Sequence, residues 1–343
     1  MNIFNRYPVL IAEIGVNFYD LAEHECISNM EAAKYMIDEA KDCGITVVEF
    51  QSYNAESIVS LNDDVATESQ YESLKRTDGF GVEEYRELAE YCQYNGMKFL
   101  STPLDFDSAD YLDEFMDIYK ISSFDITNIP FIKYIASKNK PILLSTGAST
   151  IREIKQAVSA IEEVSFVDIA IMHSVLSFPT SYEDANLLMI KDLAENFPDY
   201  EIGYSDHTKS DENMTLLTTA YNYGANILEK HFTIDKSLPG EDHEYSMDPD
   251  DVIKFQWNVH FLSKINGKKN KQPLICETSA RKKMRRSIVA SRNIKKGEKI
   301  SEDDLTFKRP GTGISPSEIN NVVGRTAKED IKEDTLIDFY MLD

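Results

Sequence analysis

The sequence predicts a (β/α)8 barrel followed by a small β-rich domain. Over roughly the first 265 residues, eight short apolar segments with strand character alternate with segments of helical periodicity. Polar residues gather at the C-terminal ends of nearly all the strand segments, which is where barrel enzymes build their active sites. A doubly wound open sheet is the competing fold, but no glycine-rich phosphate-binding sequence follows the first strand segment. Together these observations favour the barrel.

The expected strands and helices differ in the spacing of their apolar residues. We expect strands at Val9–Val16, Thr46–Gln51, Lys98–Thr102, Ile118–Ser122, Ile142–Thr146, Val167–His173, Glu201–Ser205 and Ile227–Phe232. Helical spacing of i, i+3, i+4 and i+7 occurs between them, for example at Ala33, Met36, Ile37 and Ala40. The last helix of the barrel is expected from about Pro249 to about Leu262.

The chain divides into three predicted parts. We expect residues 1–265 to form the barrel, residues 266–283 a linker and residues 284–343 the second domain. Short extended runs and turn residues such as Pro310 and Gly311 predict that the second domain is β-rich. A domain this small is marginally stable alone, so we expect it to dock onto the barrel.

The charge of the chain is unevenly distributed. Its net charge is −23, but residues 1–263 hold 18 Lys and Arg against 47 Asp and Glu, whereas residues 264–343 hold 18 against 12. The basic run Lys264–Lys296 could suggest nucleic acid binding, yet the acidic body would repel phosphate backbones. We therefore predict no nucleic acid partner, and a basic tail that lies against an acidic body, its own or a partner subunit's.

The sequence also predicts a cytoplasmic protein with no membrane partner. No apolar stretch is long enough for a transmembrane helix, and the N-terminal residues have neither a basic leader region nor a cleavage motif. The four cysteines show no CxxC spacing, which indicates reduced thiols rather than a zinc ribbon or a disulfide framework: Cys26, Cys43, Cys92 and Cys276.

Two histidines in matching positions indicate a metal site. His207 follows Ser205 by two residues and His231 follows Glu229 by two, each pair at the end of an expected strand. Residues two apart in a strand point to the same side, so the two imidazoles can face one point in space. A pair of hydrogen-bonded structural histidines is the alternative, but the repeated strand-end placement favours metal ligands.

Eight short motifs occur in order along the chain. They are AEIGVN (12–17), STPLD (101–105), KISSFD (120–125), LLSTGAS (143–149), GYSDHT (203–208), LEKHFT (228–233), LPGEDH (238–243) and KRPGTGISP (308–316). Together they make the chain resemble the sialic acid synthase family over nearly its whole length. The resemblance implies an N-terminal barrel, a C-terminal module similar to type III antifreeze proteins, and a transferase that forms carbon–carbon bonds.

The resemblance also implies a reaction. Phosphoenolpyruvate adds through C3 to the aldehyde of an open-chain acylamino sugar, which gives phosphate and a nonulosonic acid of the kind used in polysaccharide biosynthesis. A divalent ion held by His207 and His231 polarises the aldehyde, with Mn²⁺ expected and Mg²⁺ or Co²⁺ as alternatives.

Further residues receive roles by motif match. The expected catalytic residues are Glu13, Asp125, Asp242 and Glu229, with Asp125 standing where the family usually has a second Glu. The expected substrate-binding residues are Gln51, Thr102, Lys120, Ser123, Ser145, Ser205 and Arg309. Because Arg309 matches a tail arginine that reaches the sugar site of a partner subunit, the resemblance implies a homodimer with exchanged tails.

The donor side of the expected site departs from the family. Glu49-Phe50-Gln51 stands where the family has Lys-Phe-Gln, Leu176 and Phe178 replace a polar residue and a tyrosine, and Phe18 replaces a histidine. Two charges about 4 Å apart interact by roughly 4 kcal/mol at an effective dielectric constant of about 20, so repulsion of an anionic donor would be costly. We expect a divergent member with an altered donor pocket and an unusual donor or acceptor, so that a donor related to phosphoenolpyruvate stays an alternative. Alternatively, Glu49 is paired with a basic residue and is chemically idle.

Two other functions remain open at this point. One is a metal-dependent aldolase or lyase on the same scaffold that uses a non-phosphorylated donor. The other is a non-catalytic protein that binds sugar acids. The acceptor sugar is not determined, because it depends on barrel loops that include Tyr19–Asn29 and the acidic segment Asn62–Gly81.

Overall fold

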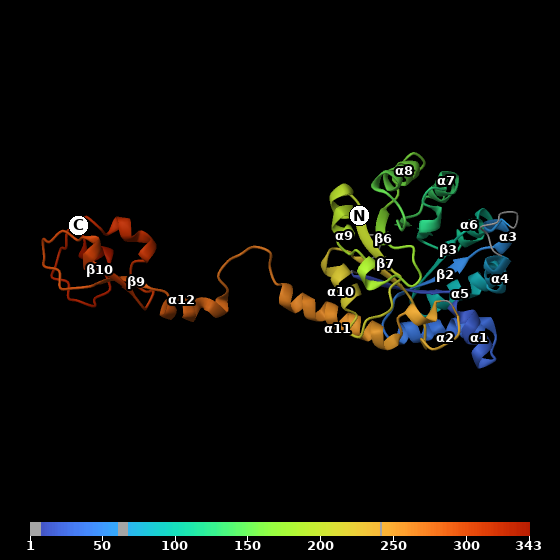
Figure 1. The fold of residues 1–343 in the computed structure, drawn as a ribbon, viewed down its shortest axis with the longest axis horizontal. Coiled ribbons are helices and arrows are strands. Elements are labelled where there is room, and N and C mark those ends of the chain that lie inside the picture. Colours follow the sequence, from blue (N-terminus) through green and yellow to red (C-terminus); the bar gives the residue numbers. More distant parts are fainter. Residues whose placement is uncertain (1–7, 61–67, 241) are drawn as a thin grey trace. The chain divides into compact units, whose positions relative to one another are not determined.

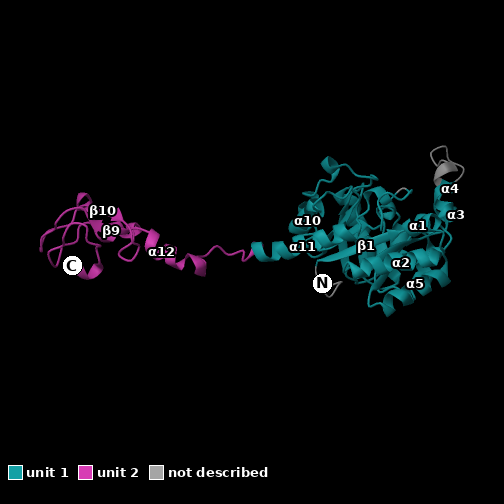
Figure 2. Ribbon diagram, turned by 90° about the horizontal axis from the view of Figure 1, so that it is seen from below, with its two compact units in different colours: residues 1–265 teal, residues 266–343 magenta. Residues whose placement is uncertain are grey.

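The computed structural model describes residues 8–60, 68–240 and 242–343 of a chain that divides into two compact units. Unit 1 comprises residues 1–265 and unit 2 comprises residues 266–343 (Figure 2), and each is described by itself. Within the described ranges, no helix combines the length and the apolar content needed to cross a bilayer.

Unit 1 contains eight parallel strands in one curved sheet (Figure 1). They are β1 (Val9–Gly15), β2 (Val47–Ser52), β3 (Lys98–Pro103), β4 (Tyr119–Ile121), β5 (Ile142–Ser145), β6 (Ile169–Ser174), β7 (Glu201–Asp206) and β8 (Ile227–His231). The hydrogen-bonded order is β3-β2-β1-β8-β7-β6-β5-β4, and β3 also lies against β4, so the sheet forms a near-closed barrel. The predicted fold is confirmed, with strand ends shifted by one or two residues.

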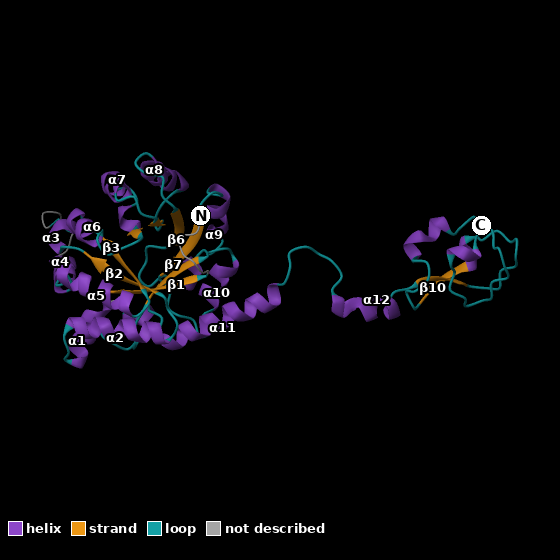
Figure 3. Ribbon diagram, turned by 180° about the vertical axis from the view of Figure 1, so that it is seen from behind, coloured by secondary structure: helices purple, strands orange, loops and turns teal. Residues whose placement is uncertain are grey.

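Helices surround the strands of unit 1 (Figure 3). They are α1 (Asn17–Glu25), α2 (Asn29–Asp42), α3 (Ala55–Ile58), α4 (Glu68–Arg76), α5 (Val82–Tyr94), α6 (Phe106–Leu112), α7 (Ile129–Ser137), α8 (Ile151–Glu162), α9 (Met189–Asn196), α10 (Thr215–Asn222) and α11 (Pro249–Asn266). α2 buries the apolar residues predicted from its spacing, and it begins at a capping box formed by Ser28 and Glu31.

Two segments expected as loops contain helices. Tyr19–Asn29 is largely occupied by α1, which buries Phe18, Leu21 and Ala22 on one face. In the segment 62–81, residues 61–67 lie outside the described residues and most of the rest forms α4. The last helix also extends to Asn266, beyond the predicted end near residue 262.

The barrel strands are buried on both faces, so polar residues in them require a specific partner or a function. All seven residues of β1 and all five of β8 are buried. Glu13 in β1 is level with Glu49 in β2 on one side and with His231 in β8 on the other. Gly15 has a positive φ of 55°, and a Cβ there would lie 2.6 Å from Glu13 Oε1. A glycine is therefore needed beside this carboxylate.

Unit 2 has its own small core. Its antiparallel strands are β9 (Ser287–Ala290) and β10 (Leu305–Lys308), and isolated bridges join further extended segments. Apolar residues between positions 288 and 342 form the core, including Ile288, Ile300 and Ile337. Part of the segment predicted as a linker carries helical structure, because α12 (Thr278–Met284) begins there.

Candidate active site

A cavity of about 470 Å³ lies at the C-terminal ends of the barrel strands. Eleven residues predicted from the sequence line it, and they come from seven of the eight strands or the segments that follow them. These are Glu13, Gln51, Thr102, Lys120, Ser123, Ser145, Ser205, His207, Glu229, His231 and Asp242. The barrel thus brings together residues that are far apart in the sequence.

His207 is held in the form that can bind a metal. Its Nδ1 donates a hydrogen bond to the carbonyl oxygen of Val175 at 2.8 Å, which leaves Nε2 as the unprotonated nitrogen. Burial and the neighbouring His231 lower the pKa of His207 to about 4, so its imidazole is neutral. The centres of the two histidine rings are 5.7 Å apart.

His231 lies among carboxylates. Its Nδ1 is 2.6 Å from Glu13 Oε2 and 3.7 Å from Asp242 Oδ2. Although burial lowers the pKa of His231, Glu13 and Asp242 raise it to about 9. The short contact does not have hydrogen-bond geometry, and within the described part of the chain neither His231 Nδ1 nor Glu13 Oε2 has a hydrogen-bond partner. This part of the cavity favours positive charge.

The loop that carries Asp242 is fixed by buried hydrogen bonds that the sequence did not reveal. The hydroxyl of Tyr245 donates to Asp242 Oδ1, and Tyr245 also lines the cavity. The buried ring of His243 bonds through Nδ1 to the hydroxyl of Thr233 at 2.7 Å. Asn17 donates both to the carbonyl oxygen of Phe232 at 2.9 Å and to the hydroxyl of Ser246 in this loop at 3.3 Å. These contacts anchor the loop to the end of β8.

Lys120 joins two carboxylates at the other side of the cavity. Its Nζ donates to Glu229 Oε2 at 2.5 Å and to Glu49 Oε1 at 3.2 Å, and all three residues are at least 95% buried. Thr102 donates to Glu49 Oε1 at 2.6 Å, and Ser205 donates to Glu229 Oε1 at 2.7 Å. The alternative in which Glu49 is paired with a basic residue is therefore observed. Lys120 was predicted to bind an anionic substrate, and in the structure it is paired with the carboxylates of Glu49 and Glu229.

The three charges influence each other's protonation. Burial and the carboxylate of Glu229 raise the pKa of Glu49. Burial also tends to raise the pKa of Glu229, but Lys120 holds it below its ordinary value. Burial lowers the pKa of Lys120, and the two carboxylates more than compensate, so Lys120 remains protonated. Two carboxylates thus share one ammonium group, and Glu49 is the one that holds a proton more readily.

Comparisons with known proteins match the whole architecture. The NeuB family model matches residues 36–271, and the SAF domain model matches residues 285–343. The N,N'-diacetyllegionaminic acid synthase of Legionella pneumophila is 36% identical over 329 residues, which cover 92% of this chain and 89% of that protein. The chain belongs to the NeuB family of sialic acid synthases. This membership makes it an enzyme, a transferase that forms carbon–carbon bonds.

Other NeuB family members support the same alignment. The N,N'-diacetyllegionaminic acid synthase of Campylobacter jejuni is 33% identical over 344 residues and covers 97% of this chain and 99% of its own. A crystal structure of N-acetylneuraminic acid synthetase from Leptospira borgpetersenii, in complex with citrate, has a TM-score of 0.71 and 32% identity. That structural match covers 80% of this chain and 90% of the other.

Among the predicted site residues of unit 1, Asp125 does not line the cavity of this NeuB family member. Asp125 lies in a short 3-10 turn after β4, where its carboxylate accepts a hydrogen bond from Asn128 at 3.0 Å. Its neighbours Ser123 and Phe124 line the cavity instead, so the geometry gives no support to a catalytic Asp125. Arg309 belongs to unit 2, and its role in a partner subunit stays a prediction.

Aromatic and apolar side chains complete the cavity wall. Leu176 and Phe178 line it at the positions where the family pattern predicted polar groups. The ring of Phe178 lies over that of His207, with 4.4 Å between ring centres, and the ring of Tyr245 lies 5.1 Å from that of His231. Aromatic rings therefore border both imidazoles.

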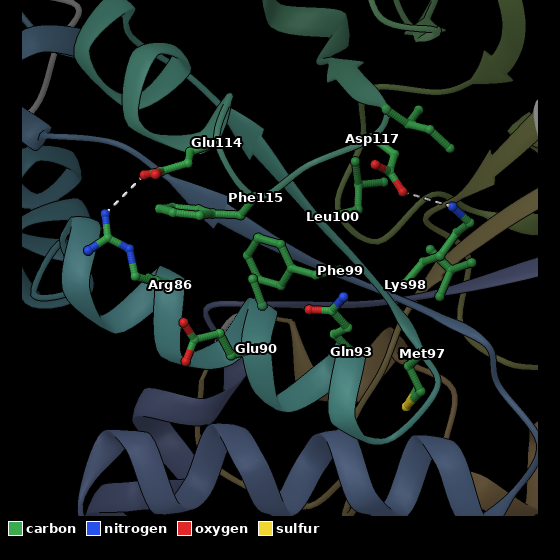
Figure 4. A pocket seen from close by; sticks show the side chains of 13 residues that line it. Arg86, Glu90, Gln93, Met97, Lys98, Phe99, Leu100, Glu114, Phe115 and Asp117 are labelled. Carbon is green, nitrogen blue, oxygen red and sulfur yellow. Dashed lines mark hydrogen bonds and ion pairs between the residues drawn. The ribbon is translucent and has the colours of Figure 1, made fainter.

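A second cavity, of about 440 Å³, lies near the N-terminal ends of β2 and β3 (Figure 4). It contains none of the predicted site residues. Four of its charged side chains are engaged in ion pairs, because Arg86 pairs with Glu114 at 3.0 Å and Lys98 with Asp117 at 3.1 Å. Barrel enzymes build their active sites at the C-terminal ends of the strands, so the first cavity is the candidate active site.

Proposed function

We propose that this chain condenses phosphoenolpyruvate with the aldehyde of an open-chain acylamino sugar to give a nonulosonic acid and phosphate. The carrying observation is the convergence of Glu13, His207, His231, Lys120 and Glu229 in one cavity. The printed names of the Legionella and Campylobacter relatives support an acid synthase. In the balanced reaction C3 of the donor bonds to the aldehyde carbon, the aldehyde oxygen gains a proton, water is consumed and phosphate leaves.

The proposal includes a divalent metal ion, Mn²⁺ by preference and Mg²⁺ or Co²⁺ as alternatives. The neutral His207 and the orphaned Nδ1 of His231 fit such an ion, and the excess of carboxylates beside them favours a cation. Among the residues that the structure describes, no group of three or more His, Cys, Asp or Glu forms a complete metal site. Water or substrate would complete the coordination, as in open catalytic sites, and a bound ion would polarise the aldehyde.

The residues of the chain perform the remaining work. Glu13 is oriented by Gln51, which donates to its Oε1 at 2.9 Å, and its second oxygen can hold a proton beside His231. Asp242, fixed by Tyr245, faces the same imidazole and can orient a water there. Lys120 supplies the positive charge nearest the donor side.

The test is an activity assay with a panel of acylamino sugars. The purified protein with Mn²⁺ and phosphoenolpyruvate should release phosphate only with an aldehyde acceptor present, together with an equal amount of keto acid identified by mass spectrometry. Phosphate release from no acceptor in the panel would contradict the proposal. Production of pyruvate from nonulosonic acids, without any use of phosphoenolpyruvate, would favour the aldolase or lyase alternative. Binding of sugar acids without turnover would favour the non-catalytic one.

We also propose a cytoplasmic homodimer. Four large apolar residues spaced four apart, Ile253, Trp257, Phe261 and Ile265, are 44 to 68% exposed along α11. We propose that a second copy of this chain, which is acidic with a basic tail, packs against these four residues. Arg309 of the partner subunit would then contribute to the sugar site. The four cysteines form no disulfide within the described residues, which supports a reducing compartment.

Sedimentation equilibrium tests the homodimer. The wild-type protein should be dimeric at micromolar concentration, and Trp257→Glu should weaken the dimer. Phe166→Glu is the matched control, because Phe166 is also an aromatic residue and is 99% exposed, but it does not belong to α11. A monomeric wild-type protein, or equal effects of the two substitutions, would contradict this part of the proposal.

A further inference from the structure

Glu49 is a buried acid in the wall of the active-site cavity that the proposed reaction leaves without a role. It lies in the middle of β2 and is 1% exposed. Four elements bring titratable or polar groups against it: Glu13 from β1, Thr102 from β3, Lys120 from β4 and Glu229 from β8. An anionic donor that enters the cavity must be accommodated next to this carboxyl group.

The two oxygens of Glu49 have different surroundings. Oε1 accepts hydrogen bonds from Thr102 at 2.6 Å and from Lys120 at 3.2 Å. In the described part of the protein Oε2 has no hydrogen-bond partner, although it is buried. The hydroxyl of Ser145, another lining residue, is also buried and without a partner there. Buried polar atoms without partners are rare in proteins, so both atoms point to a ligand.

The chemistry of the ligand decides the protonation state of Glu49. Ionised phosphate and carboxylate oxygens can only accept hydrogen bonds. An ionised Glu49 is also only an acceptor, so it could not hydrogen-bond such a ligand and would repel it. The neutral acid can bond both to the protein and to the ligand. Its Oε1 still accepts from Thr102 and Lys120, and its Oε2–H can donate to a ligand oxygen. The electrostatics of the free protein agree with this form, because burial and Glu229 raise the pKa of Glu49.

We infer that Glu49, as its neutral acid, is a donor-binding residue whose Oε2–H donates a hydrogen bond to an oxygen of phosphoenolpyruvate beside Lys120. Where Glu49 is ionised in the free protein, the donor therefore binds together with one proton taken from solvent. Lys120 retains Glu229 as its counter-ion in the complex and is shared with the donor. This inference rests on the proposed function, since it takes phosphoenolpyruvate as the donor.

The test measures phosphoenolpyruvate affinity by titration calorimetry with Mg²⁺ present, between about pH 7 and about pH 9.5, where the phosphate group is fully ionised. Wild-type affinity should fall by about tenfold per pH unit above the Glu49 titration, by proton linkage. Glu49→Gln keeps the donor group at every pH, so its affinity should change by less than about twofold over the same range. Titration of another group, such as His231, would appear in both proteins.

Two further measurements keep the inference falsifiable. Asp117→Asn, which removes a carboxylate from the second cavity, is the matched control and should keep the wild-type pH slope. Wild-type titrations at the highest pH, in two buffers with different enthalpies of ionisation, should show uptake of about one proton, which tests the inference even if Glu49→Gln does not fold. The inference is wrong if the two pH slopes agree, or if the wild-type protein takes up no proton. Absence of phosphoenolpyruvate binding in every variant at every pH would instead refute the proposed function.

Discussion

The two sides of the active-site cavity handle charge in opposite ways. On the side of His207 and His231, the described residues offer no hydrogen-bond partner to the buried His231 Nδ1 or Glu13 Oε2, and the surroundings favour a cation. On the side of Lys120, the charges are closed into a cluster with Glu49 and Glu229. The first side is therefore prepared for a ligand that adds positive charge. The second must change its protonation or its pairing before an anion can bind.

The largest expected effect comes from breaking the histidine side. His207→Ala or His231→Ala should reduce kcat by about 10³-fold, because charge on the reacting oxygen would lose its stabilisation. His24→Ala is the matched control, since His24 is exposed on α1. Steady-state kinetics with thermal unfolding of each variant would check this. A variant that keeps activity within a few-fold while folding normally would show that the two histidines are structural.

The Lys120 side should respond first through stability. Lys120→Met leaves two buried carboxylates without their counter-ion and should lower the free energy of unfolding by about 3–5 kcal/mol. Adding Glu49→Gln and Glu229→Gln to Lys120→Met should recover most of this loss, because no charge is then left unpaired. Urea unfolding measures both changes. If the triple variant is no more stable than Lys120→Met, the three residues do not form an electrostatic unit.

The pH dependence of stability sharpens the comparison further. Because the pKa of Glu49 is raised by folding, its stabilising contribution is complete below the unfolded-chain pKa and is lost as the pH rises through the folded-state value. Relative to Glu49→Gln, the wild-type protein should lose up to about 1.4 kcal/mol per pH unit between about pH 5 and about pH 8. Parallel pH profiles of urea unfolding for the two proteins would contradict the raised pKa.

The smallest effect is expected at Tyr245. Tyr245→Phe removes the hydroxyl that orients Asp242 and should lower kcat by about tenfold, which is typical for a group that acts through another residue. Its KM for the sugar should change little, because the ring remains. Tyr94→Phe, at a position that is 89% exposed, provides the control. A loss of affinity without a loss of kcat would assign Tyr245 to substrate binding instead.

Much of the cavity was predictable because strand ends carry a local signal. The spacing of two residues between Ser205 and His207, and between Glu229 and His231, is enough to indicate that both side chains of each pair point to the same side of the strand. The helix α1 was missed although Phe18, Leu21 and Ala22 have helical spacing, because the run is short and follows a strand directly. The role of Tyr245 had no local signal, since only the fold of its loop brings its hydroxyl to Asp242.

By itself, the sequence determined the barrel, the second domain, the family and the strand-end residues, because periodicity and motif order are written locally along the chain. Only the tertiary structure decided that Lys120 lies between Glu49 and Glu229, which are 71 and 109 residues away in the sequence. The physical reason for this arrangement is barrel closure, which brings the inward side chains of β2, β4 and β8 within hydrogen-bonding distance across the interior. Burial then makes their charges depend on one another.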